Sequence, residues 1–294
     1  MAARGALSLP PYGTSARLAI ITAFLVPLCV SHSIPGHAEQ QSVPPPEMVE
    51  IPLSPLPFIL QGVLRRPEGV SRSAGIVLLP ACANQAKSVD ENWGARISSW
   101  GYVTLTIDSF GPRGIKNCER AIATYADLAF DAYRGLNFLA QKRFIDPKRI
   151  AILGFGSGAW QTLTAVERGT TERASGSKFR AAVAFYPPCR GFKGIMTVPT
   201  LILIGERDDW ADIDACRKMA AGEDDTGVSR QRGEGVPMRL IAYPDAYSGF
   251  DVPALKTAIR YHGHRLQFNQ SAADQSSEAL REFLNSTVGN FGNH

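Results

Sequence analysis

The sequence predicts an α/β fold with a mostly parallel central sheet flanked by helices. Short apolar or β-branched runs, typical of buried strands, alternate along the chain with segments whose apolar residues recur at helical spacing. This alternation is typical of β-α-β units, in which successive strands lie parallel. A third observation is a glycine-rich turn, Gly154 to Gly158, between one such run and the helical pattern that follows it. The 294 residues, 45% hydrophobic and 20% charged, are enough for one large domain.

The expected strands share an apolar core and a turn-forming residue at one or both ends. They are residues 58–64, 75–79, 102–107, 150–153, 179–186, 200–204 and 238–243. The first alternates in character and is predicted to be an edge strand. Pro187-Pro188 ends the fifth and Gly205 the sixth. The ligand-binding loops of such a sheet follow the carboxyl ends of the strands, so these loops should share one rim.

The expected helices show apolar residues on one face, at a spacing of three or four. They are residues 93–100, 122–140, the segment after Gly158, 214–221 and 272–288. Gly101 is placed to end the first of them as a C-cap glycine. Residues 222–236 are polar and contain glycine, which predicts a loop.

The N-terminal residues 1–38 are typical of a cleavable export signal. Arg4 and Arg17 precede an apolar run at 18–30, and Gly36-His37-Ala38 suits cleavage after Ala38. The alternative is a membrane anchor, but the run is interrupted by Pro27 and is shorter than the ~20 residues that span a bilayer. We therefore expect an exported protein, periplasmic or secreted, with no membrane span in the mature chain. Residues 39–57 are expected to form a Pro-rich extended lead-in, 58–288 the domain, and 289–294 a tail.

The composition argues against several classes of partner. The net charge is only +4 and the basic residues are scattered, so no nucleic-acid partner is predicted. The predicted mature chain has no Cys-x-x-Cys pair and three histidines, so neither a metal site nor a cofactor is predicted. Its four cysteines allow three disulfide connectivities. We predict Cys82–Cys118 and Cys189–Cys216, because each pair falls in neighbouring segments at the same rim.

The turn at Gly154 to Gly158 has the context of a nucleophile elbow. A strand, a tight glycine turn and a helix carry the G-x-S-x-G motif of α/β-hydrolases. In that frame Gly154 and Gly158 are the flanking glycines, and Gly156 stands where the nucleophile belongs. Ser157 follows one position later.

Seven stretches of residues 58–288 together resemble the dienelactone hydrolase family of α/β-hydrolases. They are 60–67, 77–82, 108–114, 184–189, 201–210, 243–251 and 263–266. The resemblance implies a Cys or Ser nucleophile, an Asp and a His that hydrolyse lactones and related carboxylic esters. It assigns the nucleophile position to Gly156, the acid to Asp208 and the base to Ser248. The family's His-Gly at the oxyanion loop reads Pro80-Ala81.

Each remaining candidate residue has two interpretations. Ser157 is a displaced nucleophile or oxyanion N–H donor, or a small helix-start residue, and His262 or His264 is a substitute base or lies outside the site. Asp208 is a catalytic acid or a turn and N-cap residue. Arg113 binds a substrate carboxylate or is a solvated loop arginine. Cys82 belongs to the oxyanion loop or is half of a disulfide.

Two functions follow from these residues. The first is hydrolysis of small esters or lactones, weakened or lost because Gly156 cannot attack and Ser248 cannot act as a base. The second is a non-catalytic relative that binds a small ligand or a protein partner. The expected partner is a small-molecule ester or lactone, or another ligand that the sequence does not identify.

Overall fold

The computed structural model describes residues 45–52, 59–69, 71–82, 84–116, 125–223 and 234–289. The predicted export signal at 1–38 lies outside these residues. Across the described ranges, no helix has the length and apolar character needed to cross a membrane.

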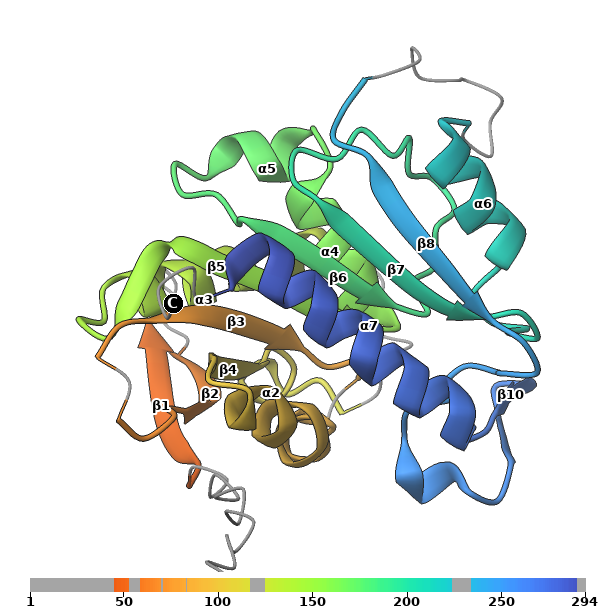
Figure 1. Ribbon diagram of the computed structural model, residues 1–294, viewed down its shortest axis with the longest axis horizontal. Helices are drawn as coiled ribbons and strands as arrows, with labels where there is room; N and C mark the ends of the chain where they lie inside the picture. The colour runs from red at the N-terminus through yellow and green to blue at the C-terminus, as the bar shows by residue number, and fades with distance from the viewer. Residues whose placement is uncertain are drawn as a thin grey trace, which may run out of the picture. The chain divides into compact units, whose positions relative to one another are not determined.

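The fold is built on an eight-stranded sheet (Figure 1). In spatial order its strands are β1 (Glu47–Pro52), β2 (Ile59–Arg65), β4 (Val103–Asp108), β3 (Ser73–Leu79), β5 (Ile145–Phe155), β6 (Ala181–Phe185), β7 (Thr200–Gly205) and β8 (Met238–Tyr243). The pairs β1–β2 and β2–β4 are antiparallel, and the pairs from β4 to β8 are all parallel. The predicted mostly parallel sheet is confirmed.

One strand assignment is wrong in its position. The strand predicted at the edge, β2, lies inside the sheet, because residues 47–52 of the Pro-rich lead-in pair with it as β1. Pro52 is the last residue of β1, a place where its missing N–H does little harm to an edge strand. The lead-in is therefore extended as expected, and part of it belongs to the sheet.

Helices cover both faces of the sheet. They are α1 (Ala86–Val89), η1 (Asp90–Gly94), α2 (Ala95–Ser99), η2 (Gly111–Arg113), α3 (Tyr125–Ala140), α4 (Ser157–Val166), α5 (Thr170–Ala174), α6 (Ile213–Ala221), η4 (Pro253–Leu255) and α7 (Gln270–Val288). In Figure 1, α7 crosses the front of the sheet and α4 lies behind it. A small hairpin, β9 (Ile259–Tyr261) and β10 (His264–Leu266), was not expected from the sequence.

The helix expected at residues 93–100 begins earlier, at Ala86, and consists of α1, a π-helical turn η1, and α2. The turn brings Asp90 into a buried ion pair with Arg65 of β2, with 2.6 Å between Nη2 and Oδ2. A pair of buried charges is tolerated when the guanidinium and carboxylate meet through two or more hydrogen bonds, as they do here. Gly101 follows α2 with φ +94°, which agrees with the predicted C-cap.

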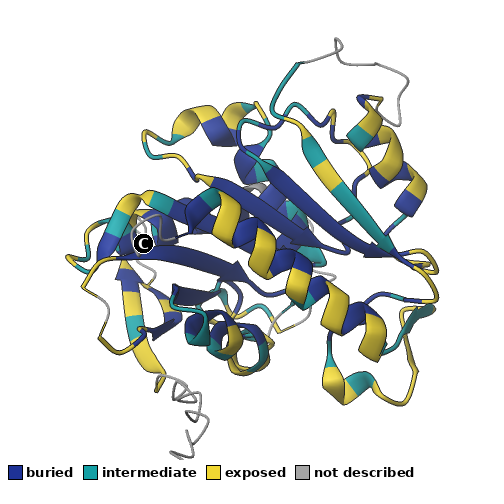
Figure 2. Cartoon of the chain, in the orientation of Figure 1, coloured by how far each residue is buried: buried dark blue, intermediate teal, exposed yellow. Residues whose placement is uncertain are grey.

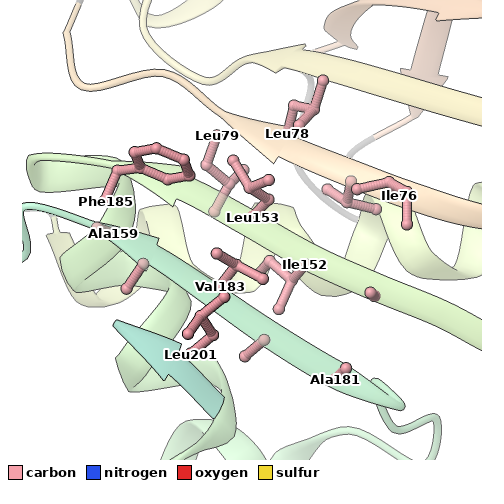
Figure 3. Close-up of a cluster of buried hydrophobic side chains, with 14 of the residues drawn as sticks. Ile76, Leu78, Leu79, Ile152, Leu153, Ala159, Ala181, Val183, Phe185 and Leu201 are labelled. Atoms are coloured by element: carbon pink, nitrogen blue, oxygen red, sulfur yellow. The ribbon is translucent and has the colours of Figure 1, made fainter. Parts of the chain in front are cut away.

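The core lies between the central strands and the helices. Ile76, Ile152, Val183 and Leu201 come from four neighbouring strands and are fully buried (Figure 3). Helix α7 presents a buried face to the sheet and an exposed face to solvent (Figure 2). Because β3 to β8 run parallel, the loops that follow them meet at one rim, as the sequence predicts.

Candidate functional site

The turn between β5 and α4 has the strand–turn–helix geometry of a nucleophile elbow. A Cβ at Gly154 would lie 2.2 Å from the carbonyl oxygen of Gly158, and one at Gly158 would lie 2.2 Å from that of Leu79. Both flanking glycines are therefore required for the close approach of β5, α4 and β3. Gly156 has φ +51° and ψ −115°, a conformation that an L-residue adopts only under strain.

Gly156 offers no group that could attack an ester. A Cβ built on it would lie 3.1 Å from the Ala81 Cβ and 3.8 Å from Cε2 of Tyr186. The nucleophile position therefore faces the loop after β3 on one side and the Tyr186 ring on the other.

Ser157 is the first residue of α4. Its hydroxyl donates a hydrogen bond to the backbone carbonyl of Ala81. The hydroxyl proton is therefore held by a carbonyl, which is not a base. This contact agrees with the interpretation of Ser157 as a helix-start residue rather than a displaced nucleophile.

Asp208 follows β7 and is 8% exposed. Its Oδ1 accepts hydrogen bonds from the backbone N–H groups of Trp210, at 2.9 Å, and Ala211, at 2.8 Å. Burial raises the pKa of Asp208 from 3.8 to about 6, against the opposing effect of these N–H groups and of the Ser248 hydroxyl. Asp208 therefore holds the turn after β7 through its backbone hydrogen bonds, while the N-cap of α6 is Asp212.

Ser248 lies beside Asp208, where the resemblance assigns the base. It is 6% exposed, and its hydroxyl is near enough to lower the pKa of Asp208. Asp208 Oδ2 nevertheless has no hydrogen bond of normal geometry. The acid and base positions are brought together, and the side chain at the second cannot take a proton near neutral pH.

Three residues at this site were not assigned a role from the sequence. Tyr186 follows β6 and has φ +41°. Its hydroxyl interacts with the buried carboxylate of Asp251. The Trp93 indole N–H donates to Asp251 Oδ2 at 2.7 Å. Burial raises the pKa of Asp251, and burial with the charge of Asp251 raises that of Tyr186. Only the proximity of Asp251 to Ser248 in the chain could have indicated this cluster.

His262 and His264 lie on the β9–β10 hairpin, next to the carboxyl ends of β7 and β8 (Figure 1). The His264 ring stacks on Trp210 with centroids 5.1 Å apart. Its Nδ1 lies 3.7 Å from Oδ1 of Asp209, the neighbour of Asp208. His264 therefore lies near the carboxylate of Asp209 rather than that of Asp208, the acid position.

Arg113 does not have the environment that either interpretation expected. Its guanidinium makes two hydrogen bonds to the fully buried Asp131, at 2.6 and 2.9 Å, and a third to the Ser109 carbonyl. The side chain is only 15% exposed, so it is not a solvated loop arginine. Because Asp131 already occupies the guanidinium, Arg113 is not presented to a substrate carboxylate in this structure.

The predicted disulfide between Cys189 and Cys216 is confirmed, with 5.0 Å between the Cα atoms. It joins the loop after β6 to α6. The predicted Cys82–Cys118 bridge lies outside the described residues, because Cys118 is not among them.

Among the residues that the structure describes, no group of three or more His, Cys, Asp or Glu side chains could hold a metal ion.

The chain belongs to the dienelactone hydrolase family, whose model matches residues 60–288. Its fold is shared with solved structures of low identity. A dienelactone hydrolase-like promiscuous phosphotriesterase, P91, from metagenomic libraries has a TM-score of 0.62 at 16% identity, over 83% of this chain and 99% of its own. A putative dienelactone hydrolase from Klebsiella pneumoniae has 0.62 at 15%, over 81% and 97%. Esterase 2 of Thermogutta terrifontis has 0.59 at 16%, over 86% and 96%. The comparison with curated proteins found no match.

Proposed function

We propose that this protein takes the ligand class of its family, small carboxylic esters or lactones, and hydrolyses them weakly or not at all. The observation that carries the proposal is Gly156. The elbow that should present a nucleophile has the required strand, turn and helix, yet its central residue has no side chain. The substrate class comes from the family, and the loss of rate comes from this residue and from Ser248.

The expected loss of rate is large. A nucleophile and its base act as a unit, and losing either costs on the order of 10⁶ in rate. The parts that remain can still supply about 10³–10⁴ over the reaction in water. Here these parts are the backbone of the elbow and the ligand-binding surface around it. A slow reaction above the uncatalysed rate is therefore expected at most.

Trapping with a serine-reactive phosphonate, together with assays on simple aryl esters and small lactones, tests this proposal. We expect no labelled serine and a turnover far below 1 s⁻¹, the lower end of ordinary enzyme rates. The Ser157→Ala variant is the matched control, because it removes the one serine of the elbow. Stoichiometric labelling of Ser157, with activity that disappears in this variant, would overturn the proposal.

The second candidate is a non-catalytic relative that binds a ligand without converting it. Asp208 favours this alternative, because a buried carboxylate with an unsatisfied oxygen remains beside the position from which the base has been lost. Binding of a non-hydrolysable lactam or ketone analogue of a substrate, measured by calorimetry in a protein with no turnover, would support it.

The compartment is also part of the proposal. The predicted signal at 1–38 and the even number of cysteines after it support a protein that works outside the cytoplasm, in the periplasm or secreted. The Cys189–Cys216 disulfide fits an oxidising compartment. Fractionation of cells that express the full chain tests this part directly.

A further inference from the structure

A cavity of about 280 Å³ lies between α4 and the loop that follows β6. Its lining comes from three segments: Trp160, Thr164 and Glu167 of α4 and its C-cap, residues 169–171, and residues 190–192. The elbow glycine, the acid position and Ser248 are not part of this lining, so the cavity is separate from the candidate catalytic site. Its volume is close to the lower end of the ~300–1,000 Å³ found for ligand pockets, which suits a ligand built on a single small ring.

The loop that forms one wall of the cavity is fixed to two helices. The Cys189–Cys216 disulfide joins it to α6, with 5.0 Å between the Cα atoms. Glu167, the C-cap of α4, accepts a hydrogen bond at Oε1 from the backbone N–H of Gly194, at 2.7 Å. The cavity is therefore formed before a ligand arrives, and a ligand that enters it orders little additional chain.

Two aromatic rings form an apolar corner of the cavity. Trp160 and Phe192 meet edge to face, with centroids 5.8 Å apart and ring planes at 61°. Phe192 is 5% exposed, whereas Trp160 is partly exposed, and both line the cavity. The negative face of an aromatic ring attracts the slightly positive C–H groups of a saturated ring, and the contact adds dispersion. The corner therefore suits a ligand with one apolar face.

The lining also contains hydroxyl groups that no protein group occupies. Within the described residues, the side chains of Thr170 and Thr171 make no hydrogen bond. The Thr171 oxygen remains open to solvent, although the residue as a whole is only 9% exposed. A hydroxyl both donates and accepts, so these two groups fit a ligand that does the same.

The charged side chains of the lining balance each other. Arg190 and Glu167 have opposite sign, and both already have partners. Nη2 of Arg190 donates to Asp212 Oδ2 at 2.6 Å, which leaves other guanidinium N–H groups for a ligand. The carboxylate of Glu167 is held by the N–H of Gly194. An ionic ligand would therefore find no uncompensated charge, and an uncharged ligand with several hydroxyl groups fits the lining better.

We infer that this cavity binds a single neutral sugar ring. The C–H face of the sugar packs against the rings of Trp160 and Phe192. Its hydroxyl groups exchange hydrogen bonds with Thr170 and Thr171, and one of them accepts from Arg190. The inference stands apart from the proposed function, because it requires no hydrolysis and uses no residue of the elbow turn.

Four methyl glycosides, those of glucose, galactose, mannose and xylose, are the probes. Calorimetric titration of the full chain at neutral pH should give saturable binding in the millimolar range for at least one of them. Cyclohexanol, a ring of similar size with a single hydroxyl, should bind about tenfold more weakly or not at all, because it lacks most of the hydrogen bonds.

Tryptophan fluorescence locates the bound glycoside. Binding should change the emission, because the sugar contacts the Trp160 ring. The change should disappear in Trp160→Phe. It should persist in Trp210→Phe, the matched control, since Trp210 lies on the loop after β7 and does not line the cavity.

Thr171→Val tests the polar part of the site. It keeps the shape of the side chain and removes the hydroxyl, so the affinity for the glycoside should fall about fivefold. Thr287→Val on α7 is the matched control, with unchanged affinity, because α7 and α4 lie on opposite faces of the sheet (Figure 1). Trp160→Ala tests the apolar corner and should lower the affinity about tenfold or more.

Three results would overturn the inference. The first is that none of the four glycosides binds saturably at up to about 50 mM, well above the expected range. The second is wild-type affinity in Thr171→Val and Trp160→Ala, in variants that melt cooperatively. The third is binding of benzoate or benzylamine with no binding of any glycoside, which would assign the cavity to a charged aromatic ligand. None of these results bears on ester hydrolysis, so the proposed function is tested separately.

Discussion

Gly156 has a backbone conformation that few side chains adopt, and any attempt to restore a nucleophile depends on it. The φ of +51° is strained for an L-residue, and an added Cβ would lie 3.1 Å from that of Ala81. A shift of a few tenths of an ångström in the Ala81 loop would accommodate it. The position is therefore crowded but not closed to a serine.

We predict that Gly156→Ser combined with Ser248→His raises ester hydrolysis by at least about a hundredfold over wild type, the lower range of general-base catalysis. Either change alone should do little, because nucleophile and base act as a unit. Initial rates with an aryl ester measure the effect, and Ser157→Ala in the same background is the control. A wild-type preparation free of contaminating esterase that already turns over about 1 s⁻¹ or more would contradict it.

Asp208 makes a second residue-level prediction, on stability. Its pKa in the folded protein, about 6, is above the ordinary 3.8. The folded state therefore binds a proton more tightly than the unfolded state, and the ionised carboxylate destabilises the fold above about pH 6. This cost is relieved as the pH falls from about 6 to 4.

Asp208→Asn should accordingly raise the free energy of unfolding at pH 7 by about 1–3 kcal/mol. The asparagine oxygen can still accept from the N–H groups of Trp210 and Ala211. The advantage should shrink when urea denaturation is repeated near pH 4. A gain of the same size at both pH values would show that ionisation of Asp208 is not its cause, and Asp214→Asn should give no gain.

At the scale of elements, the strands of the parallel sheet were predictable because they are buried on both faces. Their apolar runs are continuous, as in β3 and β7, and turn residues mark their ends. The edge strand β1 was missed, because three prolines directly precede it and one ends it, and its burial is slight. The hairpin β9–β10 was missed for a related reason: each strand has only three residues, and no period can be read from them.

The elbow glycines give an element-level prediction. Gly158→Ala should lower the free energy of unfolding by about 2–4 kcal/mol, because its Cβ would overlap the carbonyl oxygens of Leu79 and Pro80 and force α4 away from β3. Gly176→Ala is the matched control, since nothing lies within 4 Å of its added Cβ. Its effect should stay within about 0.5 kcal/mol. Chemical denaturation measures the free energy of unfolding of both variants. Equal losses in the two would contradict the close approach of α4 to β3 at Gly158.

The disulfide gives a second element-level prediction. Cys189 and Cys216 are 27 residues apart and tie the loop after β6 to α6, the helix that follows the Asp208 turn. Replacing both with serine should cost about 2–4 kcal/mol of stability, chiefly by freeing the unfolded chain. Urea midpoints of the oxidised wild type and the double variant measure the difference. Unchanged midpoints would mean that the bridge adds nothing to the fold.

At the scale of the whole molecule, the sequence predicted the architecture and the family, but it could not predict the surroundings of single residues. The elbow at 154–158, the turn with Asp208 after β7 and the stretch 243–251 with Ser248 could be recognised because their turn chemistry is local. The ion pair of Arg113 with Asp131 joins a loop to a helix that follows it, and no local pattern reports it. The contact between Tyr186 and Asp251 likewise depends on how two distant loops meet at the rim.

The last prediction concerns the mature chain. If residues 1–38 are an export signal, the exported protein should begin at or near Glu39, because Gly36 and Ala38 are the small residues that cleavage requires. This cleavage removes no part of the sheet, since β1 begins at Glu47 and pairs with β2 along its whole length. N-terminal sequencing of exported material measures the site, and Ala38→Asp should block cleavage there while leaving the domain unchanged. Exported protein that begins at Met1 would contradict the prediction, and a start beyond Glu47 would remove residues of β1 and should lower the stability of the sheet.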